Sequence, residues 1–374
     1  MDILFLSVSA GGGHMKAAES LRTHVEESYP GSRTILLDSL KYINPIMNKL
    51  VIGGYLSTVQ ITPKLYGKLY DLAEAGENIS EVSQIINRII SYKIKRLVRQ
   101  FAPDLIVCTH PFTSQMVTRL KKQSLLSPKI VTVLTDFIPH SFWLHEGVDA
   151  YVVAHPGMKY DMISKGIAEE TIFPLGIPIS KRFLEPLGKI EARTNLGLAN
   201  KTTILLMGGS LGFGDIKEVF TGLAESHRDL QLIVVAGQNK ELYKKIKRYS
   251  NHVDKIIKVF GYTDKIPALM TASDLLISKP GGMTVSEALV KKLPMILISP
   301  IPGQEEKNAR YLLNGGVAAR LYPKQNIEEV LYQVFDIPAR YNQMKEMCGY
   351  LAHPNACQEI VNLFEQLIKN KAPQ

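Results

Sequence analysis

Short apolar runs rich in β-branched residues alternate with amphipathic stretches along the whole chain. Runs of this kind are typical of strands buried on both faces, and the stretches between them have the periodicity of surface helices. The alternation predicts an α/β fold with parallel sheets covered by helices on both faces. The expected strands cover residues 2–8, 33–37, 105–108, 130–134 and 150–153, and then 203–207, 231–235, 255–259, 275–277, 295–298 and 318–321.

The strands form two series, separated by a segment rich in proline and glycine at 176–188. Because 374 residues exceed what one hydrophobic core usually organises, we expect two Rossmann-like domains, which bind ligands beyond the carboxyl ends of their strands. The first comprises residues 1–185 together with a C-terminal helix within 355–374, and the second comprises residues 186–354. The apolar residues of that helix fall on one face, so we expect it to cross back to the first domain.

The composition is that of a soluble globular protein, with 45% hydrophobic and 21% charged residues. The N-terminus reads as a first strand without a basic leader, so a cytoplasmic protein is expected. Three scattered cysteines exclude a disulfide framework, and no Cys/His spacing indicates a metal site. The net charge of +9 admits nucleic acid, an anionic membrane surface or an anionic substrate as a partner.

Two segments stand apart from the alternating pattern. Basic residues gather between Arg88 and Lys122, with Asp104 as the single acid, as on a solvated helix face or beside an anionic partner. The segment from Asn44 to Tyr70 is apolar and aromatic, carries isolated lysines and is broken by glycine and proline. An interfacial segment that dips into lipid headgroups and a buried lid helix both fit this composition, and the sequence leaves both open.

Glycine-rich turns follow the first strand of each series, at 9–14 and at 207–214. Such turns cradle phosphates, although neither is a clean dinucleotide fingerprint. A third glycine segment, at 278–287, opens a predicted helix with Gly281 and Gly282 and places Glu287 one turn further on. Its amides and helix N-terminus suit an anion and Glu287 suits a ribose, as in a nucleotide seat. A plain helix start, in which glycine and threonine serve only as turn and cap residues, fits the segment as well.

Asp38 ends the second expected strand and could hold a ribose, which raises the alternative of a nicotinamide enzyme. Hydride transfer would leave the segment at 281–287 without a role.

Polar side chains at the ends of the first series indicate proton transfer. His14 ends the first glycine turn, where a neutral imidazole can take a proton from a hydroxyl nucleophile or simply bond to backbone at a helix start. Asp136, His140 and Trp143 follow the strand at 130–134. They could orient the base, hold an acceptor hydroxyl and supply an apolar platform, or form a satisfied loop network.

Two segments of the second series supply further binding groups. The backbone near Tyr262 follows the strand at 255–259 and could meet the edge of a nucleobase. Gln304, Glu305 and Asn308 open a helix after the strand at 295–298, where side-chain amides and carboxylates suit sugar hydroxyls.

Taken in order, the segments 9–14, 135–143, 208–212, 279–287 and 302–308 resemble the signatures of a family of lipid glycosyltransferases. The family includes monogalactosyldiacylglycerol synthase and the bacterial processive diacylglycerol glucosyltransferases, with the lipid II-forming N-acetylglucosaminyltransferase as a more distant relative. The resemblance covers most of the chain and implies a glycosyltransferase-B fold, a UDP-sugar donor in the C-terminal domain and a lipid acceptor at the N-terminal domain. Plant members carry an extended N-terminal region that this chain lacks, which favours a bacterial-type enzyme and weakens the case for galactose.

The resemblance also implies a role for each motif residue. By this resemblance Glu287 would bind the ribose and the backbone near Tyr262 the uracil. Residues 281–284 would bind the diphosphate, and Gln304 with Glu305 the sugar. The full expected site comprises the catalytic residues His14 and Asp136, the donor-binding residues Gly209, Ser210, Gly212, Tyr262, Gly281, Gly282, Met283, Thr284, Glu287, Gln304, Glu305 and Asn308, and the acceptor-binding residues Gly12, Gly13, His140 and Trp143.

The expected reaction is an inverting transfer of a hexose, preferably glucose, from a UDP-sugar to diacylglycerol or a glycosyl-diacylglycerol at the cytoplasmic face of the membrane. No cofactor, metal ion or nucleic acid is expected to take part. Two alternatives keep the same fold, namely a soluble UDP-sugar epimerase and a UDP-sugar sensor without turnover.

Overall fold

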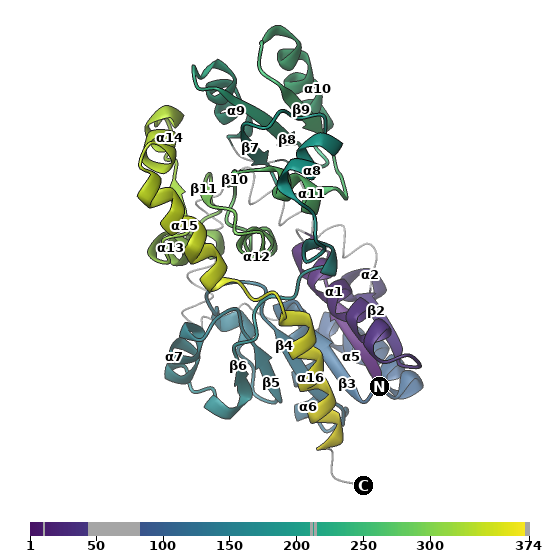
Figure 1. The fold of residues 1–374 in the computed structure, drawn as a ribbon. Coiled ribbons are helices and arrows are strands. Elements are labelled where there is room, and N and C mark those ends of the chain that lie inside the picture. The colour runs from purple at the N-terminus through teal and green to yellow at the C-terminus, as the bar shows by residue number, and fades with distance from the viewer. Residues whose placement is uncertain (10–11, 44–82, 210–211, 213–214, 371–374) are drawn as a thin grey trace. The chain divides into compact units, whose positions relative to one another are not determined.

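The computed structural model describes residues 1–9, 12–43, 83–209, 212 and 215–370. Contacts divide the chain into an N-terminal unit (Met1–Ser180, Ile301–Gln304 and His353–Gln374) and a C-terminal unit (Lys181–Pro300 and Glu305–Ala352). Each unit is built on a six-stranded sheet in which every pairing is parallel (Figure 1). The prediction of an α/β protein with two Rossmann-like sheets is therefore confirmed.

The sheet of the N-terminal unit has the strand order β2-β1-β3-β4-β5-β6. Its strands are β1 (Asp2–Ser7), β2 (Arg33–Asp38), β3 (Leu105–Cys108), β4 (Lys129–Val133), β5 (Ala150–Val152) and β6 (Ile172–Phe173). Its helices are α1 (Gly13–Ser28), α2 (Ser39–Ile43), α5 (Ser83–Phe101), α6 (Pro111–Lys122), α7 (Gly157–Ser164) and α16 (Ala356–Lys369), with 3₁₀ turns η1 (Ser141–Trp143) and η2 (Glu169–Thr171).

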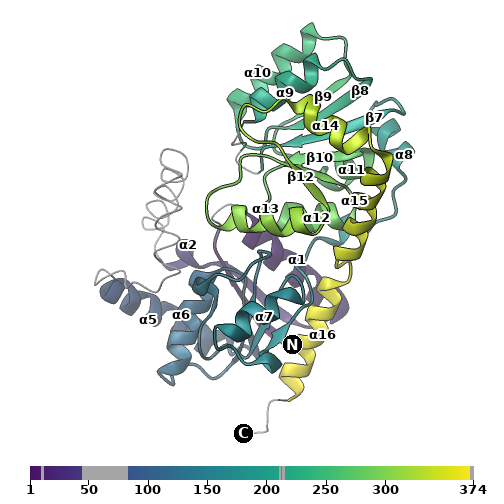
Figure 2. The ribbon, with the colours of Figure 1, turned by 90° about the vertical axis from the view of Figure 1, so that its left-hand side faces the viewer.

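The C-terminal helix α16 packs on one face of this sheet beside α1, as the apolar stripe predicts (Figures 1 and 2). Its Phe364 is fully buried, with its ring centroid 6.5 Å from that of Phe5 on strand β1. Helix α6 covers the opposite face, where the hydroxyls of Ser114 and Thr132 lie 2.7 Å apart. Both faces are thus closed to water, which explains why the strands read as continuous apolar runs.

The sheet of the C-terminal unit has the strand order β12-β11-β10-β7-β8-β9. Its strands are β7 (Thr202–Met207), β8 (Leu230–Val235), β9 (Ile257–Phe260), β10 (Leu275–Ser278), β11 (Met295–Leu297) and β12 (Ala318–Arg320). Its helices are α8 (Lys189–Asn195), α9 (Ile216–Glu225), α10 (Lys240–Tyr249), α11 (Ile266–Ala272), α12 (Gly282–Val290), α13 (Gln304–Asn314), α14 (Ile327–Phe335) and α15 (Pro338–Leu351), with 3₁₀ turns η3 (Lys181–Phe183) and η4 (Ser250–His252).

One face of this second sheet packs against α9, α10 and α14. Phe220 of α9 is almost fully buried there, and its ring meets that of Tyr249 edge to face at a centroid distance of 5.5 Å. Burial of the apolar side chains of these three helices against the sheet is the main contribution to the stability of this packing.

Strand β6 was not expected from the sequence. It consists of Ile172 and Phe173 and pairs only with β5, at the edge of the sheet. Two residues are too few to show a period, so only the tertiary pairing defines this strand. The segment at 44–70 lies outside the described residues, and among the helices described none is long and apolar enough to cross a bilayer.

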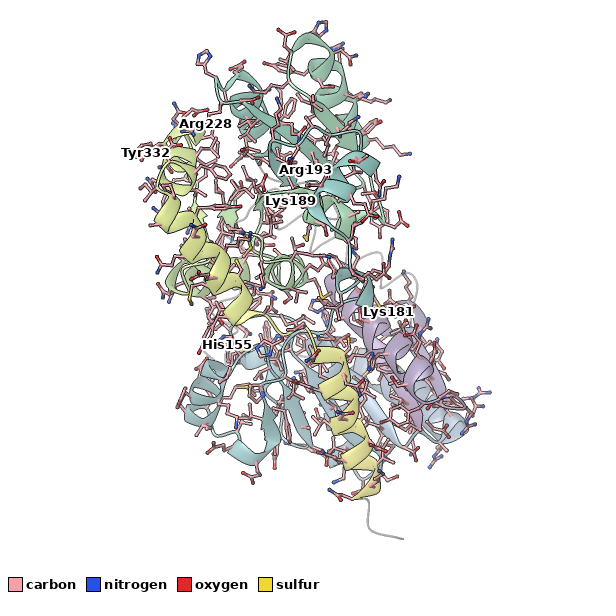
Figure 3. The ribbon with its side chains drawn as sticks, in the orientation of Figure 1. His155, Lys181, Lys189, Arg193, Arg228 and Tyr332 are labelled. Atoms are coloured by element: carbon pink, nitrogen blue, oxygen red, sulfur yellow. The ribbon has the colours of Figure 1, made fainter. Side chains whose placement is uncertain are left out.

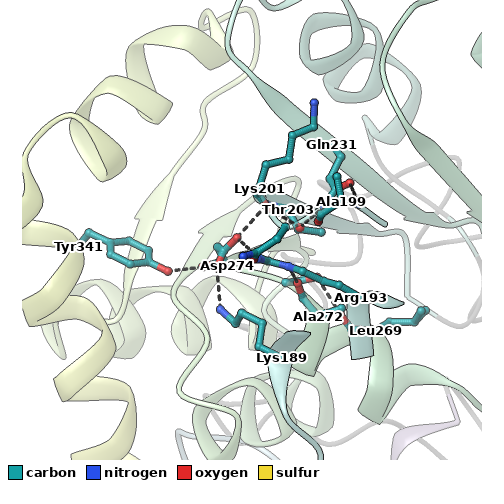
Figure 4. A network of polar contacts seen from close by, with 12 residues as sticks. Lys189, Arg193, Ala199, Lys201, Thr203, Gln231, Leu269, Ala272, Asp274 and Tyr341 are labelled. Carbon is teal, nitrogen blue, oxygen red and sulfur yellow. Dashed lines mark hydrogen bonds and ion pairs between the residues drawn. The ribbon is translucent and has the colours of Figure 1, made fainter. Parts of the chain in front are cut away.

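An ion network around the buried side chain of Arg193 holds the amino ends of β7 and β10 (Figures 3 and 4). Asp274, directly before β10, accepts hydrogen bonds from Arg193 Nη2 at 2.6 Å, from Lys189 Nζ at 2.6 Å and from the backbone amide of Thr203 at 2.8 Å. Arg193 is buried and also donates to the carbonyl of Ala272 at 3.0 Å. The network therefore ties helix α8 to the two central strands of the sheet.

We expect Asp274→Ala to lower the free energy of unfolding of the C-terminal unit by about 3–5 kcal/mol, because removal of one partner leaves the buried Arg193 charge uncompensated. Denaturant unfolding followed by circular dichroism measures the change. Asp229→Ala is the matched control, because the Asp229 side chain is exposed and its pair with Lys201 contributes about 1 kcal/mol or less. Equal losses in the two variants would contradict the assignment.

Candidate active site

Polar side chains gather at the carboxyl edge of the N-terminal sheet. His14 lies in the first turn of α1, which follows β1. Thr109 and His110 follow β3, and Thr135 and Asp136 follow β4. Because β1, β3 and β4 are neighbours and parallel, their carboxyl ends meet at one edge. The topological switch point of the sheet lies between β1 and β3, since β2 is added on one side of β1 and the later strands on the other.

Two hydrogen bonds fix the ring of His14. Its Nδ1 lies 2.9 Å from the carbonyl oxygen of Thr109 and 2.8 Å from the hydroxyl oxygen of Thr135. A carbonyl oxygen only accepts, so Nδ1 carries the proton and donates it to Thr109. In the neutral ring this leaves the lone pair on Nε2, which is the atom that can act as a base.

Thr109 also fixes the backbone on which His14 sits. The Thr109 hydroxyl lies 2.8 Å from Ser7 Oγ and 3.0 Å from the carbonyl oxygen of His14. Thr109 therefore bonds to both the ring and the main chain of the same histidine, and it joins the ends of β1 and β3.

The electrostatic setting keeps His14 neutral near neutral pH. Burial lowers the pKa of His14 below its ordinary value of 6.5, against the opposing charge of Asp136 and the hydrogen bond to Thr109. Asp136 itself is buried. A base must be unprotonated to accept a proton, so a lowered pKa extends its working range towards acidic pH.

The expected acceptor residues lie at the same edge. Gly12 is the N-cap of α1 and Gly13 its first residue. Trp143 is buried at the end of η1, with its ring centroid 6.1 Å from that of His14. His140 is buried and caps η1, its Nδ1 accepting from the amide of Phe142 at 3.1 Å. The structure thus brings Trp143 directly beside the candidate base.

The sequence alone did not single out Thr109, Thr135 or His110 for a role at this site. The ring of His110 lies edge to face with that of His14, at a centroid distance of 4.6 Å. A histidine followed by Pro111 directly after an apolar strand is a signal that could have pointed to a polar helix start at the sheet edge.

The glycine loop of the C-terminal unit follows β7, and Ser210 lies outside its described residues. Gly209 and Gly212 adopt positive φ angles of 68° and 66°. A Cβ on Gly212 would lie 2.2 Å from the carbonyl oxygen of Ala236, at the end of β8. Glycine at 212 therefore lets the loop press against the end of the neighbouring strand.

The second glycine segment follows β10 and opens α12. Gly281 is the N-cap of α12, with an ordinary φ of −73°, and it has no side chain to accept from the first-turn amides. A Cβ at this position would meet no atom of the other described residues within 4 Å. These amides, at the positive end of the helix macrodipole, form a setting that suits an anion.

The remaining expected donor residues surround this segment or lie further along the edge. Gly282, Met283 and Glu287 are buried in α12, whereas Thr284 is half-buried. Asn308 of α13 is buried, and its side-chain amide donates to the carbonyl of Pro280 at 3.1 Å, so it shapes the turn before Gly281.

Gln304 and Glu305 open α13 and are half-buried, whereas Tyr262 is 64% exposed beyond the edge strand β9. β9 lies three strands from β10, which is about 14 Å along the edge at ordinary strand spacing. The groups expected to bind the nucleotide are therefore spread along the edge rather than clustered at one point.

Among the described residues, no group of three or more His, Cys, Asp or Glu side chains could hold a metal ion. The N-terminal unit carries the imidazole of His14 at the carboxyl edge of its sheet, and the C-terminal unit carries glycine turns at the carboxyl edge of its own sheet.

Two parallel Rossmann-like sheets, each with polar groups or glycine turns at its carboxyl edge, define the architecture of glycosyltransferase-B proteins. Solved structures share it over nearly the whole chain. MurG of Acinetobacter baumannii has a TM-score of 0.61 at 16% identity and covers 98% of this chain and 99% of its own. The UDP-bound MnaA of S. aureus has a TM-score of 0.65 at 14% identity and covers 100% and 98%.

Family models and sequence relatives narrow the class. The model of monogalactosyldiacylglycerol synthase matches residues 14–179, and that of the glycosyltransferase family 28 C-terminal domain matches residues 203–360. A processive diacylglycerol beta-glucosyltransferase of Bacillus cytotoxicus is 30% identical over 364 residues, which is 96% of this chain and 92% of the relative. A protein of the same name from Bacillus cereus is 30% identical over 363 residues, with the same coverage.

The chain belongs to the family of the monogalactosyldiacylglycerol synthases and processive diacylglycerol glucosyltransferases. The resemblance expected from the motifs is confirmed, and so is the expectation of a sugar-transferring enzyme.

Proposed function

We propose that the protein transfers a hexose from a UDP-sugar to diacylglycerol or a glycosyl-diacylglycerol, with inversion at the anomeric carbon. Glucose is the preferred sugar and galactose the alternative. The family membership supports a lipid acceptor, because relatives of this chain are named diacylglycerol glucosyltransferases.

The order of groups along the C-terminal sheet edge carries the donor half of the proposal. From β9 through β7 and β10 to β11, the edge presents the segment near Tyr262, the two glycine turns and then the start of α13 with Gln304 and Glu305. A UDP-sugar has the linear order uracil, ribose, diphosphate, sugar. The expected binding groups for base, diphosphate and sugar follow the same order along the sheet.

In the proposed mechanism, Nε2 of His14 takes the proton of the acceptor hydroxyl. The hydroxyl oxygen bonds to the anomeric carbon from the face opposite the diphosphate, and the bond from that carbon to the diphosphate breaks with its electron pair on UDP. Amides of the glycine turns and of the first turn of α12 stabilise the charge that develops on the leaving group. The proposed mechanism therefore uses no metal ion.

The site of action is proposed to be the cytoplasmic face of the cell membrane, with no nucleic acid as partner. Several cations of the basic run are already engaged, since Lys121 pairs with Asp149 and Lys122 with Glu146, and Lys93 donates to the carbonyl of Ile43 at 2.8 Å. Arg96 and Arg99 of α5 are exposed and are the cations we assign to an anionic lipid surface.

Incubation with diacylglycerol vesicles and a panel of radiolabelled UDP-sugars tests the reaction. We expect lipid-soluble counts with wild-type protein, and a fall of about 10²- to 10⁴-fold in rate for His14→Ala, because the general base is lost. Affinity for UDP should be unchanged. His24→Ala, on the same helix, is the control and should transfer normally.

Other outcomes of this assay point to the alternatives. Conversion of the UDP-sugar without lipid-soluble counts would indicate an epimerase, and intact donor throughout would indicate a sensor. Normal transfer by His14→Ala would remove His14 as the base.

The donor seat is tested by adding one methyl group at Gly281. Gly281→Ala should leave the melting temperature unchanged, because its φ is ordinary and its Cβ meets no atom within 4 Å in the part of the chain that the structure describes. The KM for the UDP-sugar should rise about tenfold, since overpacking a filled seat costs about 1–3 kcal/mol. Gly212→Ala provides the contrast, because its Cβ clashes with Ala236 in the free protein and should lower stability itself. An unchanged KM in Gly281→Ala would exclude a diphosphate from this position.

Vesicle flotation tests the membrane surface. We expect the double variant Arg96→Ala/Arg99→Ala to bind anionic vesicles about 30-fold more weakly, since each basic residue near such a surface contributes about 1 kcal/mol. The control is Lys244→Ala/Lys247→Ala on α10, which removes the same charge from exposed positions elsewhere. Equal losses in both variants would indicate attraction by net charge alone and would contradict a specific surface on α5.

A further inference from the structure

His110 is a second imidazole beside the candidate base, and its hydrogen bonds determine which of its nitrogens carries a proton. It is the N-cap of α6, and its Nδ1 lies 3.1 Å from the backbone amide of Phe112, from which it accepts. An amide N–H only donates here, so Nδ1 holds a lone pair. In the neutral ring the proton is then on Nε2.

The neutral form of His110 is strongly favoured. Burial lowers the pKa of His110 well below its ordinary value of 6.5, and the neighbouring His14 lowers it further. His110 as a whole residue is half-buried at the sheet edge.

The two imidazoles therefore have opposite tautomers. His14 donates through Nδ1 to Thr109 and keeps a lone pair on Nε2, whereas His110 accepts at Nδ1 and keeps an N–H on Nε2. Their ring centroids are 4.6 Å apart and their planes are inclined by 75°. A ring that can accept a proton and a neutral ring that can donate a hydrogen bond are thus neighbours.

Helix capping alone does not account for an imidazole at this position. Asn, Asp, Ser and Thr are the strongly preferred N-caps, and each would satisfy the same amide with a smaller side chain. The part of the ring that a small cap would lack is the edge that carries Nε2.

We propose that His110 is a further catalytic residue, whose Nε2–H donates a hydrogen bond to the oxygen of the acceptor hydroxyl while the hydroxyl proton points to Nε2 of His14. The donor stabilises the negative charge that grows on this oxygen as His14 removes the proton. His110 itself exchanges no proton and forms no covalent bond. The inference rests on the proposed function, in which the acceptor is an alcohol and His14 is the base.

A pair of amide variants separates the two roles of His110. In His110→Asn the side-chain oxygen replaces Nδ1 as the cap and nothing replaces Nε2, whereas in His110→Gln the amide nitrogen can take the place of Nε2. We expect His110→Asn to keep the wild-type melting temperature but to lose about 100-fold in kcat for glycolipid formation, as for removal of one donor from a developing oxyanion. His110→Gln should keep more of the activity than His110→Asn.

Wild-type turnover by His110→Asn would overturn the proposal and leave His110 as a cap only. Equal losses in the two variants would also overturn it, because the donor at the Nε2 position would then have no effect. UDP affinity, measured by calorimetry, should be the same in wild type and both variants, and a loss of affinity in either would place His110 with the donor instead.

A second measurement does not depend on the reaction. Nitrogen-15 NMR of the imidazoles should show His14 as the Nδ1–H tautomer and His110 as the Nε2–H tautomer, assigned by comparison with His14→Ala and His110→Asn. The same tautomer at both positions would overturn the pairing even if glycolipid is formed. Opposite tautomers in a protein without transfer would instead place the fault with the proposed function.

Discussion

The parallel pairing of every described strand is the constraint from which the site follows. In a parallel sheet each segment that leaves a strand at its carboxyl end leaves at the same edge, whatever its position in the chain. This constraint brings the carbonyl oxygen of Thr109 to 2.9 Å from Nδ1 of His14, although the two residues are 95 positions apart in the sequence. It also places the turn after β7 beside the turn after β10, because these two strands are paired.

Much of the fold could be predicted because strands that are buried on both faces consist of continuous apolar residues. Leu105–Cys108 and Leu275–Ser278 are buried throughout, and the sequence predicts strands there at 105–108 and 275–277. The amphipathic stripe of α16 foretold its return to the N-terminal sheet, where Phe364 packs near Phe5. The strand at Ile172 and Phe173 could not be foreseen, since its existence depends on pairing with β5 and not on any pattern of its own.

The site was only partly predictable, and the division has a physical reason. His14 and the turn at Gly281 could be predicted from residue type alone, since an imidazole or a pair of glycines at the end of a strand is suited to few roles. Thr109 acts at the ring of His14 through its main-chain carbonyl, a group that every residue possesses. The tautomer of His110 is fixed by the hydrogen bond that its Nδ1 accepts from the backbone amide of Phe112. Hydrogen-bond partners of this kind become visible only when the coordinates are known.

The amino ends of β7 and β10 carry the ion network, and the glycine turns follow the carboxyl ends of the same two strands. At the amino ends, Asp274 bonds to Thr203 in both directions, since the Asp274 amide donates to the Thr203 carbonyl and the Thr203 amide donates to the carboxylate, each at 2.8 Å. Arg193 and Lys189 hold that carboxylate in place, so the register of the two strands is fixed by charge as well as by the ladder. The glycine turns start only a few residues further along the same strands. The ion network at the amino edge therefore supports the same strand pairing that holds the two turns next to each other at the carboxyl edge.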